Sequence, residues 1–327
     1  MRLLSESQDY IHGGTQKDEY APADVVEVAC PLCGTQDREL LYTEHAVIGV
    51  VRCRGCSLIY TSPRLKEPEK VYWGDEDLYY AEARLIFEGK APHHRDPNYL
   101  EEIVLIERHA SKGRLLDVGC NMGRLLALAK ARGWDARGVE PSPTLSKLAR
   151  KWGVEIHNCF LHEMPESENG AFDVVCFSDV FEHITEPKAF LEQAKRLLKP
   201  RGLLYVKVPN ALWSLLKQRL LGWAGRRPQQ GLWDAYEHVV HYTDGTLKRM
   251  IEGSGLRVVE VTTARPVQTP NWHELVGHYY QYPTPALMDM RRKAVRSGFH
   301  ALSGMERALR FGKLGYFAQS VVALARQ

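Results

Sequence analysis

Short apolar runs alternate with amphipathic segments along the middle of this 327-residue chain. Short continuous apolar runs are typical of strands buried on both faces, and apolar residues at helical spacing are typical of packed helices. The runs predict strands over residues 114–118, 136–140, 154–157, 172–178 and 203–208, and the periodic segments predict helices over 99–110, 123–132, 143–151 and 186–198. Strands and helices that take turns in this way form right-handed crossovers. We therefore expect an α/β fold with a doubly wound, mostly parallel sheet.

The composition is that of an ordinary soluble globular protein, with 44% hydrophobic residues, 25% charged residues and a net charge of +3. This charge gives no reason to expect a polyanionic partner. The first residues lack the apolar core of a signal peptide, and no run of about 18 apolar residues occurs. We therefore expect a cytoplasmic protein without a transmembrane segment. Its oligomeric state is not indicated by any pattern.

Four of the seven cysteines form two matched pairs, each with two residues between its cysteines: Cys30 with Cys33, and Cys53 with Cys56. Each pair can bind one side of a tetrahedral Zn²⁺, because the tight turn after the first cysteine directs both thiolates inward. A redox pair would not be expected twice. The pattern predicts a structural zinc that holds the fold of residues 25–62. The other three cysteines are isolated and are expected to be small core residues: Cys120, Cys159 and Cys176.

A predicted strand ends on a carboxylate and breaks into a glycine turn within residues 115–123, Leu-Leu-Asp-Val-Gly-Cys-Asn-Met-Gly. A dinucleotide fingerprint would place glycine at 119, 121 and 124, whereas this chain has Gly119, Asn121 and Arg124. Asp117 also disfavours a dianionic pyrophosphate beside the turn. Glu140, at the end of the next predicted strand, can accept from both hydroxyls of a ribose; its alternative is a surface carboxylate. The pattern predicts a pocket for an adenosine ligand that carries a cation.

These features resemble class I S-adenosylmethionine-dependent methyltransferases, whose first motif reads acid-x-Gly-x-x-x-Gly and whose second strand ends in an acid. Residues 178–184, Ser-Asp-Val-Phe-Glu-His-Ile, resemble the signature after the fourth strand of this family. Residues 236–243, Tyr-Glu-His-Val-Val-His-Tyr-Thr, resemble a segment of its small-molecule branch, which also bears an N-terminal zinc knuckle. The resemblance covers residues 30 to about 264. It implies a Rossmann-like, seven-stranded sheet and S-adenosylmethionine as the cofactor.

The cofactor is expected along the carboxyl ends of the strands, as in other open α/β sheets. The resemblance and the glycine turn together imply these cofactor-binding residues: Asp117, Gly119, Cys120, Asn121, Gly123, Glu140, Pro141, Phe160, Leu161, Ser178, Asp179, Tyr79 and Tyr80. Core packing is the alternative for Phe160 and Leu161, and exposure on a linker is the alternative for the two tyrosines.

An acceptor that must lose a proton needs a base, and imidazole titrates near the working pH. The candidate catalytic residues are His183, His238 and His241, together with Glu237. Glu237 and His238 are adjacent, so a relay between them requires a loop or the flank of a helix start. We expect one of the three histidines to act directly. His183 has the best position, just past the fourth strand, although a helix-start histidine can also merely cap or pack.

Changes in residue pattern along the chain predict four parts. The first two are a zinc module over 25–62 and a connector or lid over 63–98. The other two are the S-adenosylmethionine-binding domain over 99–265, with a lid insertion at 211–240, and a helical C-terminal extension over 266–327. Residues 211–233 are apolar and basic, which favours an amphipathic lid over the acceptor, with docking to a membrane surface as the alternative. Residues 291–327 carry eight Lys or Arg against one Glu, typical of a solvated basic face that could also touch an anionic lipid or RNA.

We therefore expect a methyltransferase that acts on oxygen or carbon of a small molecule such as a sugar or secondary metabolite. One alternative is an rRNA methyltransferase with a zinc knuckle, but residues 25–62 are nearly balanced in charge and a nucleic-acid partner is not expected. A second alternative is a non-enzymatic module that binds zinc and an adenosyl ligand, which the two Glu-His signatures disfavour.

Overall fold

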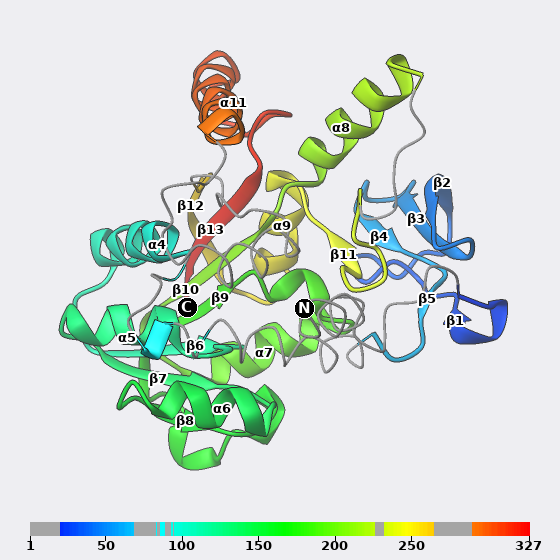
Figure 1. The fold of residues 1–327 in the computed structure, drawn as a ribbon. Helices are drawn as coiled ribbons and strands as arrows, with labels where there is room; N and C mark the ends of the chain where they lie inside the picture. Colours follow the sequence, from blue (N-terminus) through cyan, green and yellow to red (C-terminus); the bar gives the residue numbers. More distant parts are fainter. Residues whose placement is uncertain are drawn as a thin grey trace, which may run out of the picture.

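The computed structural model describes residues 20–68, 83, 86–88, 93, 95–225, 232–264 and 290–327. Its centre is a seven-stranded sheet (Figure 1). Across the sheet the strands are β12 (Arg257–Thr262), β13 (Ser320–Arg326), β10 (Leu198–Pro209), β9 (Phe172–Ser178), β6 (Arg114–Val118), β7 (Asp135–Val139) and β8 (Glu155–His157). The five strands β10, β9, β6, β7 and β8 are parallel to one another, and β13 is antiparallel to both β10 and β12. The predicted α/β class and the mostly parallel sheet are confirmed.

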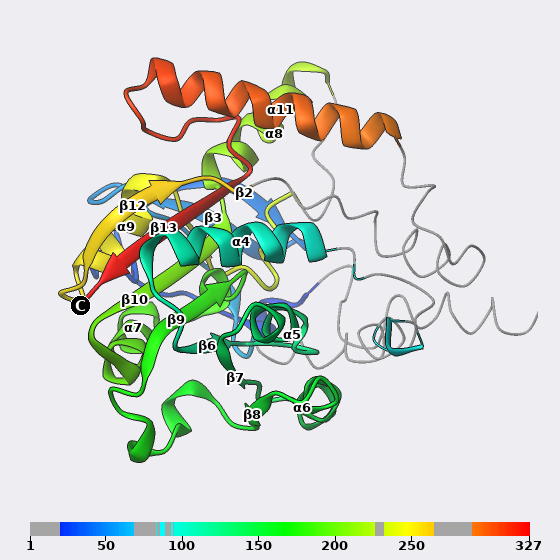
Figure 2. The ribbon, with the colours of Figure 1, turned by 90° about the vertical axis from the view of Figure 1, so that its left-hand side faces the viewer.

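Helices cover both faces of this sheet. They are α4 (Asp96–His109), α5 (Arg124–Ala131), α6 (Pro143–Arg150), α7 (Pro187–Leu197) and α9 (Asp244–Glu252). Ile103 of α4 and Leu126 of α5 belong to the core on one face, which is turned towards the viewer in Figure 2. Leu191 of α7 and Leu247 of α9 belong to the core on the other face. The crossovers predicted from the sequence therefore place the strand ends at one common edge.

A smaller sheet builds the N-terminal module. Its strands are, in order, β11 (Val240–His241), β4 (Ile59–Thr61), β3 (Ile48–Cys53) and β2 (Arg38–Glu44). A separate pair, β1 (Val25–Val26) with β5 (Arg64–Leu65), follows a short 3-10 helix, η1 (Pro22–Asp24). The module thus extends into the expected connector over 63–98, and its strand β11 begins at the last residue of the expected lid insertion over 211–240. The rest of that connector, including Tyr79 and Tyr80, falls largely outside the described residues.

The C-terminal part differs from the helical extension expected over 266–327. A helix is present, α11 (Met290–Leu309), but Ser320–Arg326 form β13 inside the main sheet. Leu314, Phe317 and Val321 have helical spacing with Leu309, yet they lie beyond the end of α11 in a loop and a strand. Val321 to Ala325 are all buried, as expected of a strand covered on both faces, and this burial outweighs the spacing.

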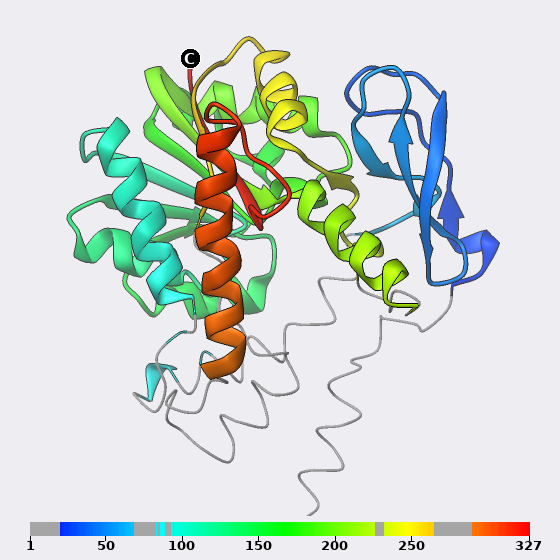
Figure 3. The same cartoon turned by 90° about the horizontal axis from the view of Figure 1, so that it is seen from above.

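Two helices stand on the same side of the molecule, beyond one end of the sheet. They are α8 (Ala211–Trp223) and α11, which lie nearest the viewer in Figure 3. Trp213 of α8 contacts Phe299 of α11, with ring centroids 4.9 Å apart. Within the described ranges, no helix combines the length and apolar character needed to cross a bilayer.

Candidate active site

The glycine turn after β6 is a tight bend in which three residues have the left-handed backbone conformation. Gly119 has φ 69°, Asn121 has φ 51° and Gly123 has φ 77°, a region that costs glycine little. A Cβ on Gly119 would lie 2.8 Å from Val180 Cγ2, and one on Gly123 would lie 2.8 Å from Ala149 Cβ. The bend therefore requires glycine for its backbone angles and for close packing, and it leads directly into α5.

Glu140 braces this bend from the end of β7. Its carboxylate accepts from the Asn121 amide at 2.8 Å and from the Ser142 amide at 2.9 Å. Asn158 Nδ2 donates to the Glu140 carbonyl at 2.9 Å, which joins the end of β8 to the same point. Glu140 is 7% exposed, so the alternative of a surface carboxylate is wrong. Each carboxylate oxygen can accept more than one hydrogen bond, so the braced group keeps the chemistry needed to hold hydroxyls.

Asp117 lies at the end of β6 and is 4% exposed. Burial raises the pKa of Asp117 well above its ordinary value, and the neighbouring charge of Glu102 acts in the same direction, whereas the Cys176 thiol lowers it. Burial therefore disfavours the charged form of this carboxyl, and the charge of Arg95 acts in the opposite direction. A positively charged ligand beside it would favour ionisation.

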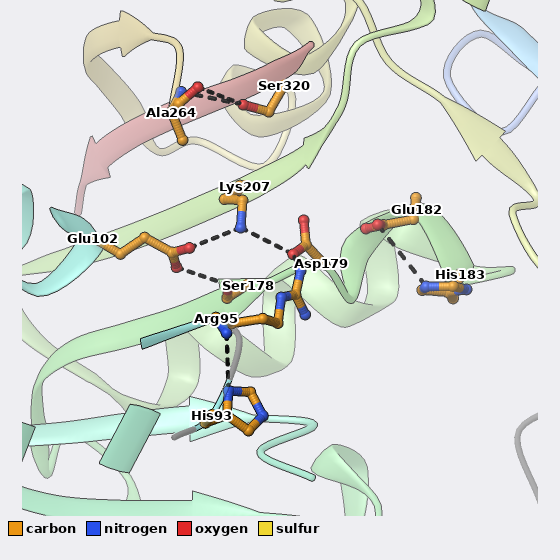
Figure 4. A network of polar contacts seen from close by, with 10 residues as sticks. All are labelled: His93, Arg95, Glu102, Ser178, Asp179, Glu182, His183, Lys207, Ala264 and Ser320. Atoms are coloured by element: carbon orange, nitrogen blue, oxygen red, sulfur yellow. Dashed lines mark hydrogen bonds and ion pairs between the residues drawn. The ribbon is translucent and has the colours of Figure 1, made fainter. Parts of the chain in front are cut away.

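A buried polar network holds the turn that follows β9 (Figure 4). Asp179 has φ 56°, and its Oδ2 accepts from Lys207 Nζ at 2.9 Å and from Arg95. Lys207 Nζ also donates to Glu102 Oε1 at 2.7 Å, and the Ser178 hydroxyl donates to Glu102 Oε2 at 2.7 Å. Burial opposes the charge of Lys207, but the carboxylates of Asp179 and Glu102 outweigh it and raise the pKa of Lys207. Ser178 and Asp179 were expected to contact the cofactor, and their side chains form hydrogen bonds within this network.

Glu102, Lys207 and Arg95 were not predicted from the sequence. The sequence could have indicated Lys207, because it is the one charged residue in the apolar run over 203–208. A lysine in a central strand must bury its ammonium group and therefore needs carboxylate partners. Nothing local to the run indicates that one of these partners is Glu102.

The two residues after β8 that were expected to bind the cofactor, Phe160 and Leu161, differ in their exposure. Phe160 is 43% exposed and stacks on His162, whereas Leu161 is 3% exposed and belongs to the core. The side chain of Cys120 is likewise buried in the core, against Gly138. Pro141 is half-buried, and its carbonyl accepts from Asn158 Nδ2 at 2.9 Å. Core packing is thus the role of Leu161 and of the Cys120 side chain, while Phe160 is open to a ligand.

The three predicted histidines come together from two distant segments. His183 ends the short helix η4 (Phe181–His183). His238 lies just before β11, and His241 is the last residue of β11. The ring centroids of His183 and His238 are 4.6 Å apart, and those of His238 and His241 are 6.5 Å apart. Burial lowers the pKa of all three, that of His241 to about 3. The cluster is therefore neutral near pH 7.

Two glutamates accompany the cluster. Glu182 is 2% exposed, and its Oε1 lies 3.9 Å from His183 Nε2 (Figure 4). Its Oε2 has no hydrogen-bond partner among the residues that the structure describes. Burial raises the pKa of Glu182, with Asp179 acting in the same direction. Glu237 Oε1 lies 4.0 Å from His238 Nε2, which is longer than a hydrogen bond. These two atoms are therefore close without a hydrogen bond between them, and the relay between Glu237 and His238 stays a prediction.

A cavity of about 80 Å³ lies between α8 and residues 232–241. His238 and His241 line it, together with Glu182. Its walls include two indole rings, those of Trp213 and Trp233. His183 is not among the lining residues, so the two histidines of the second segment are the ones that face this space.

The four cysteines of the two knuckles gather at one point. Their Sγ atoms lie within 4.8 Å of one another, with 3.5 Å between Cys30 and Cys56 and 3.4 Å between Cys33 and Cys53. A tetrahedral zinc with bonds of about 2.3 Å would hold sulfurs about 3.8 Å apart, so the set fits this metal. Burial opposes ionisation of Cys33, but the Thr35 amide and the neighbouring thiols lower its pKa to about 7.

One further group of potential donors is equally compact among the described residues. Glu182, His183 and His238 each offer an atom within 4.8 Å of the others. Because two neutral imidazoles and a carboxyl group meet beside the cavity, this group is also suited to proton transfer.

Residues 92–261, over half of the chain, match the family described as "Methyltransferase domain". Among curated proteins, the chain is 29% identical over 135 residues to a ubiquinone biosynthesis O-methyltransferase of Rhodopseudomonas palustris, covering 38% of this chain and 52% of that protein. It is 34% identical over 104 residues to a protein of the same name from Xanthomonas oryzae pv. oryzae, covering 30% and 43%. The chain thus spans about half the length of the curated relatives it matches.

Two solved structures are similar over most of their own length. One is a possible histamine N-methyltransferase of Thermotoga maritima, with 18% identity, 76% of this chain and 99% of that chain covered, and a TM-score of 0.44. The other is a 1,6-didemethyltoxoflavin-N1-methyltransferase of Burkholderia thailandensis with bound 1,6-didemethyltoxoflavin and S-adenosylhomocysteine, with 15% identity, 89% and 99% covered, and a TM-score of 0.46.

Proposed function

The chain belongs to the methyltransferase domain family as a class I S-adenosylmethionine-dependent member, and from that premise we propose that it methylates oxygen or carbon of a small molecule. One observation carries the proposal: two neutral histidines, His238 and His241, line the cavity beside the turn that follows β9. The expected small-molecule acceptor would occupy this cavity, and the cofactor would lie along the adjoining strand ends.

The cofactor site is assigned to the glycine bend and its two acids. The bend at Gly119 and Gly123 lets a ligand approach the backbone closely. Glu140, braced by two amides, would accept from the ribose hydroxyls, and Asp117 would face the cationic part of the donor. The approach of that cation would lower the pKa of Asp117 and favour its charged form.

Methyl transfer is an in-line displacement, in which the methyl group passes from the sulfonium to the acceptor and the sulfur keeps the bonding electron pair. Alignment in a water-poor site can supply on the order of 7–11 kcal/mol. The proton of the acceptor would go to His238, which lines the cavity. Burial lowers its pKa, but Asp234 and Asp179 act in the opposite direction. His241, with a pKa of about 3, is too weak a base for this role.

The walls of the cavity and the relatives both support a hydroxylated ring as acceptor. Trp213, which is half-buried, offers flat apolar surface of the kind that stacks on a sugar face or an aromatic ring. The named curated relatives are O-methyltransferases, which supports transfer to oxygen. Neither observation favours RNA as the acceptor.

We further propose that the four knuckle cysteines bind one structural Zn²⁺. The distances between the sulfur atoms support this assignment. All four positions of the tetrahedron would be filled by thiolates, so the metal would offer no open position for chemistry. Its role would be to hold the N-terminal module together.

The test uses methyl-labelled S-adenosylmethionine with separate small-molecule and rRNA fractions. Label in the small-molecule fraction, reduced about 10²–10⁴-fold by His238→Gln, is the expected result. Binding of S-adenosylhomocysteine should remain unchanged in that variant, because His238 faces the acceptor cavity. Label in rRNA would refute the small-molecule acceptor. No label in either fraction, with cofactor binding intact, would indicate the non-enzymatic module. Loss in His183→Gln but not in His238→Gln would move the base to His183.

A further inference from the structure

The segment over residues 232–242 carries both cavity-lining histidines and is held from two sides. On one side, the Val239 amide donates to the Glu182 carbonyl at 2.9 Å. On the other, the Thr61 amide of the N-terminal module donates to the Val239 carbonyl at 3.0 Å. The same module pairs its strand β4 with β11, with Val240 opposite Tyr60. The position of the histidines therefore depends on the module as well as on the main sheet.

Thr61 makes two further contacts with this segment. Its Oγ1 donates to the His238 carbonyl at 2.8 Å and lies 3.2 Å from His241 Nε2. A hydroxyl has one hydrogen, and a carbonyl can only accept, so that hydrogen is committed to His238. The contact with His241 must then run from the ring to the hydroxyl. Nε2 of His241 therefore carries the proton, and Nδ1 is left as the acceptor nitrogen.

We infer that Thr61 is a positioning residue for the methyl transfer proposed above. It holds the main chain of His238 at the cavity and fixes His241 as the tautomer with the proton on Nε2. Thr61 is completely buried, so no water competes for either bond. The catalytic part of this inference rests on the proposed function, whereas the tautomer is a property of the chain itself.

Glu44 holds the other end of the segment in the same way. Its carboxylate accepts from the Trp233 amide at 2.8 Å and from the Ala235 amide at 2.8 Å, and it is 2% exposed. The module thus fixes the segment at both ends through side chains of β2 and β4. Because the knuckle of Cys53 and Cys56 forms the turn between β3 and β4, the metal site braces the strand that carries Thr61.

The experiment compares Thr61→Val, which removes the hydroxyl, with Thr61→Ser, which keeps it. Long-range ¹H–¹⁵N NMR of the imidazoles in the zinc-loaded protein should show the His241 proton on Nε2 in the wild type and in Thr61→Ser. Thr61→Val should shift His241 towards the other tautomer. Its kcat should fall on the order of 10- to 100-fold, the loss expected from a misplaced catalytic group, with an unchanged Kd for S-adenosylhomocysteine. Thr43→Val, the same change at an exposed position of β2, is the control and should alter neither readout.

The inference is overturned if folded Thr61→Val keeps both the Nε2 proton and the wild-type kcat. It is also overturned if the wild-type spectrum places the His241 proton on Nδ1, a reading that does not require Thr61→Val to fold. Failure of the proposed function gives a different result: the wild type would methylate no small molecule, while the tautomer and its dependence on the Thr61 hydroxyl would still be observed.

Discussion

Lys207 and Glu102 form an ion pair that is almost fully shielded from solvent. Lys207 Nζ lies 2.7 Å from Glu102 Oε1, and the two side chains are 2% and 1% exposed. The pair joins β10 to α4 across the edge of the sheet where the active site is proposed. Because Lys207 also donates to Asp179, it fixes the turn that leads from β9 to His183.

Replacing Lys207 with Met should destabilise the protein strongly. The variant would leave the buried carboxylate of Glu102 without its cation, while Asp179 keeps Arg95 as a partner. Removing one partner of a buried ion pair costs about 3–5 kcal/mol. The free energy of unfolding in urea measures the loss. Lys199→Met is the matched control, since Lys199 forms an equally short pair with Asp173 at 2.8 Å but is 42% exposed. Its loss should be about 1 kcal/mol or less. Equal losses for the two variants would contradict a special role for the buried pair.

Replacing Glu140 with Ala should weaken cofactor binding. The carboxylate braces the bend through two amides, and hydrogen bonds to a charged group contribute about 1.5–3 kcal/mol each. We expect the Kd for S-adenosylhomocysteine to rise by about 10- to 100-fold, as measured by titration calorimetry. Glu155→Ala removes a carboxylate at the start of the neighbouring strand β8, where it is 55% exposed, and should leave the Kd unchanged. An unaltered Kd in Glu140→Ala would remove this residue from the ribose site.

Replacing Gly119 with Ala should be more harmful than the same change at Gly170. Both glycines have positive φ, 69° and 63°, so both variants carry a similar backbone penalty. Only at Gly119 would the new methyl group meet a neighbour, Val180 Cγ2 at 2.8 Å. We expect an additional loss of about 1–3 kcal/mol in the free energy of unfolding, typical of overpacking. Similar losses in the two variants would show that Val180 moves aside without cost.

One zinc per chain should be found by elemental analysis of the purified protein. Cys53→Ser should abolish it, because three thiolates cannot complete the tetrahedron. Cys159→Ser removes a thiol outside the cluster and should retain the metal. The apparent binding energy of about 10–16 kcal/mol for such sites means that metal loss should unfold the N-terminal module. Retention of a full equivalent of zinc by Cys53→Ser would contradict the assignment.

The contribution of His241 to stability should be lost in acid. In the folded chain burial lowers its pKa from 6.5 to about 3. Between these values the unfolded state binds the extra proton, so the contribution is present above pH 6.5 and declines as the pH falls towards 3. The difference in free energy of unfolding between the wild type and His241→Asn should therefore shrink by about 2 kcal/mol from pH 7 to pH 5. Exposed His162→Asn is the control, and a difference independent of pH for His241→Asn would contradict a buried neutral ring.

The local parts of the site could be predicted from the sequence, whereas pairings between distant segments could not. Glycine at 119 and 123, and an acid after each of two strands, depend on backbone geometry within a few residues. The pair of Glu102 with Lys207 joins positions 105 residues apart, and the contact of Thr61 with His241 joins positions 180 residues apart. Apolar patterns indicate which residues are buried but not which buried polar groups meet.

The same limit explains why the parallel strands were predicted from the sequence and why β11 and β13 were not. The strands β6, β7 and β9 were predicted because each apolar run is followed by a helix that returns the chain to the same edge, and β8 and β10 were predicted from their apolar runs. The strand β11 has two residues, too few for a pattern, and exists because β4 presents an open edge to it. Strand β13 was missed because its apolar residues also fit a helical stripe, and only its two neighbours decide between them.

The position of β13 also sets the order in which the sheet can be completed during synthesis. Its residues pair with β10 on one side and with β12 on the other, and both of these strands leave the ribosome earlier. Until Ser320–Arg326 emerge, β10 presents an open edge and β12 lacks the only strand partner it has in the described chain. An unpaired apolar edge is prone to join other chains. A nascent chain stalled before Ser320 is therefore a candidate for chaperone capture or aggregation, even though the residues of the proposed site have already been made.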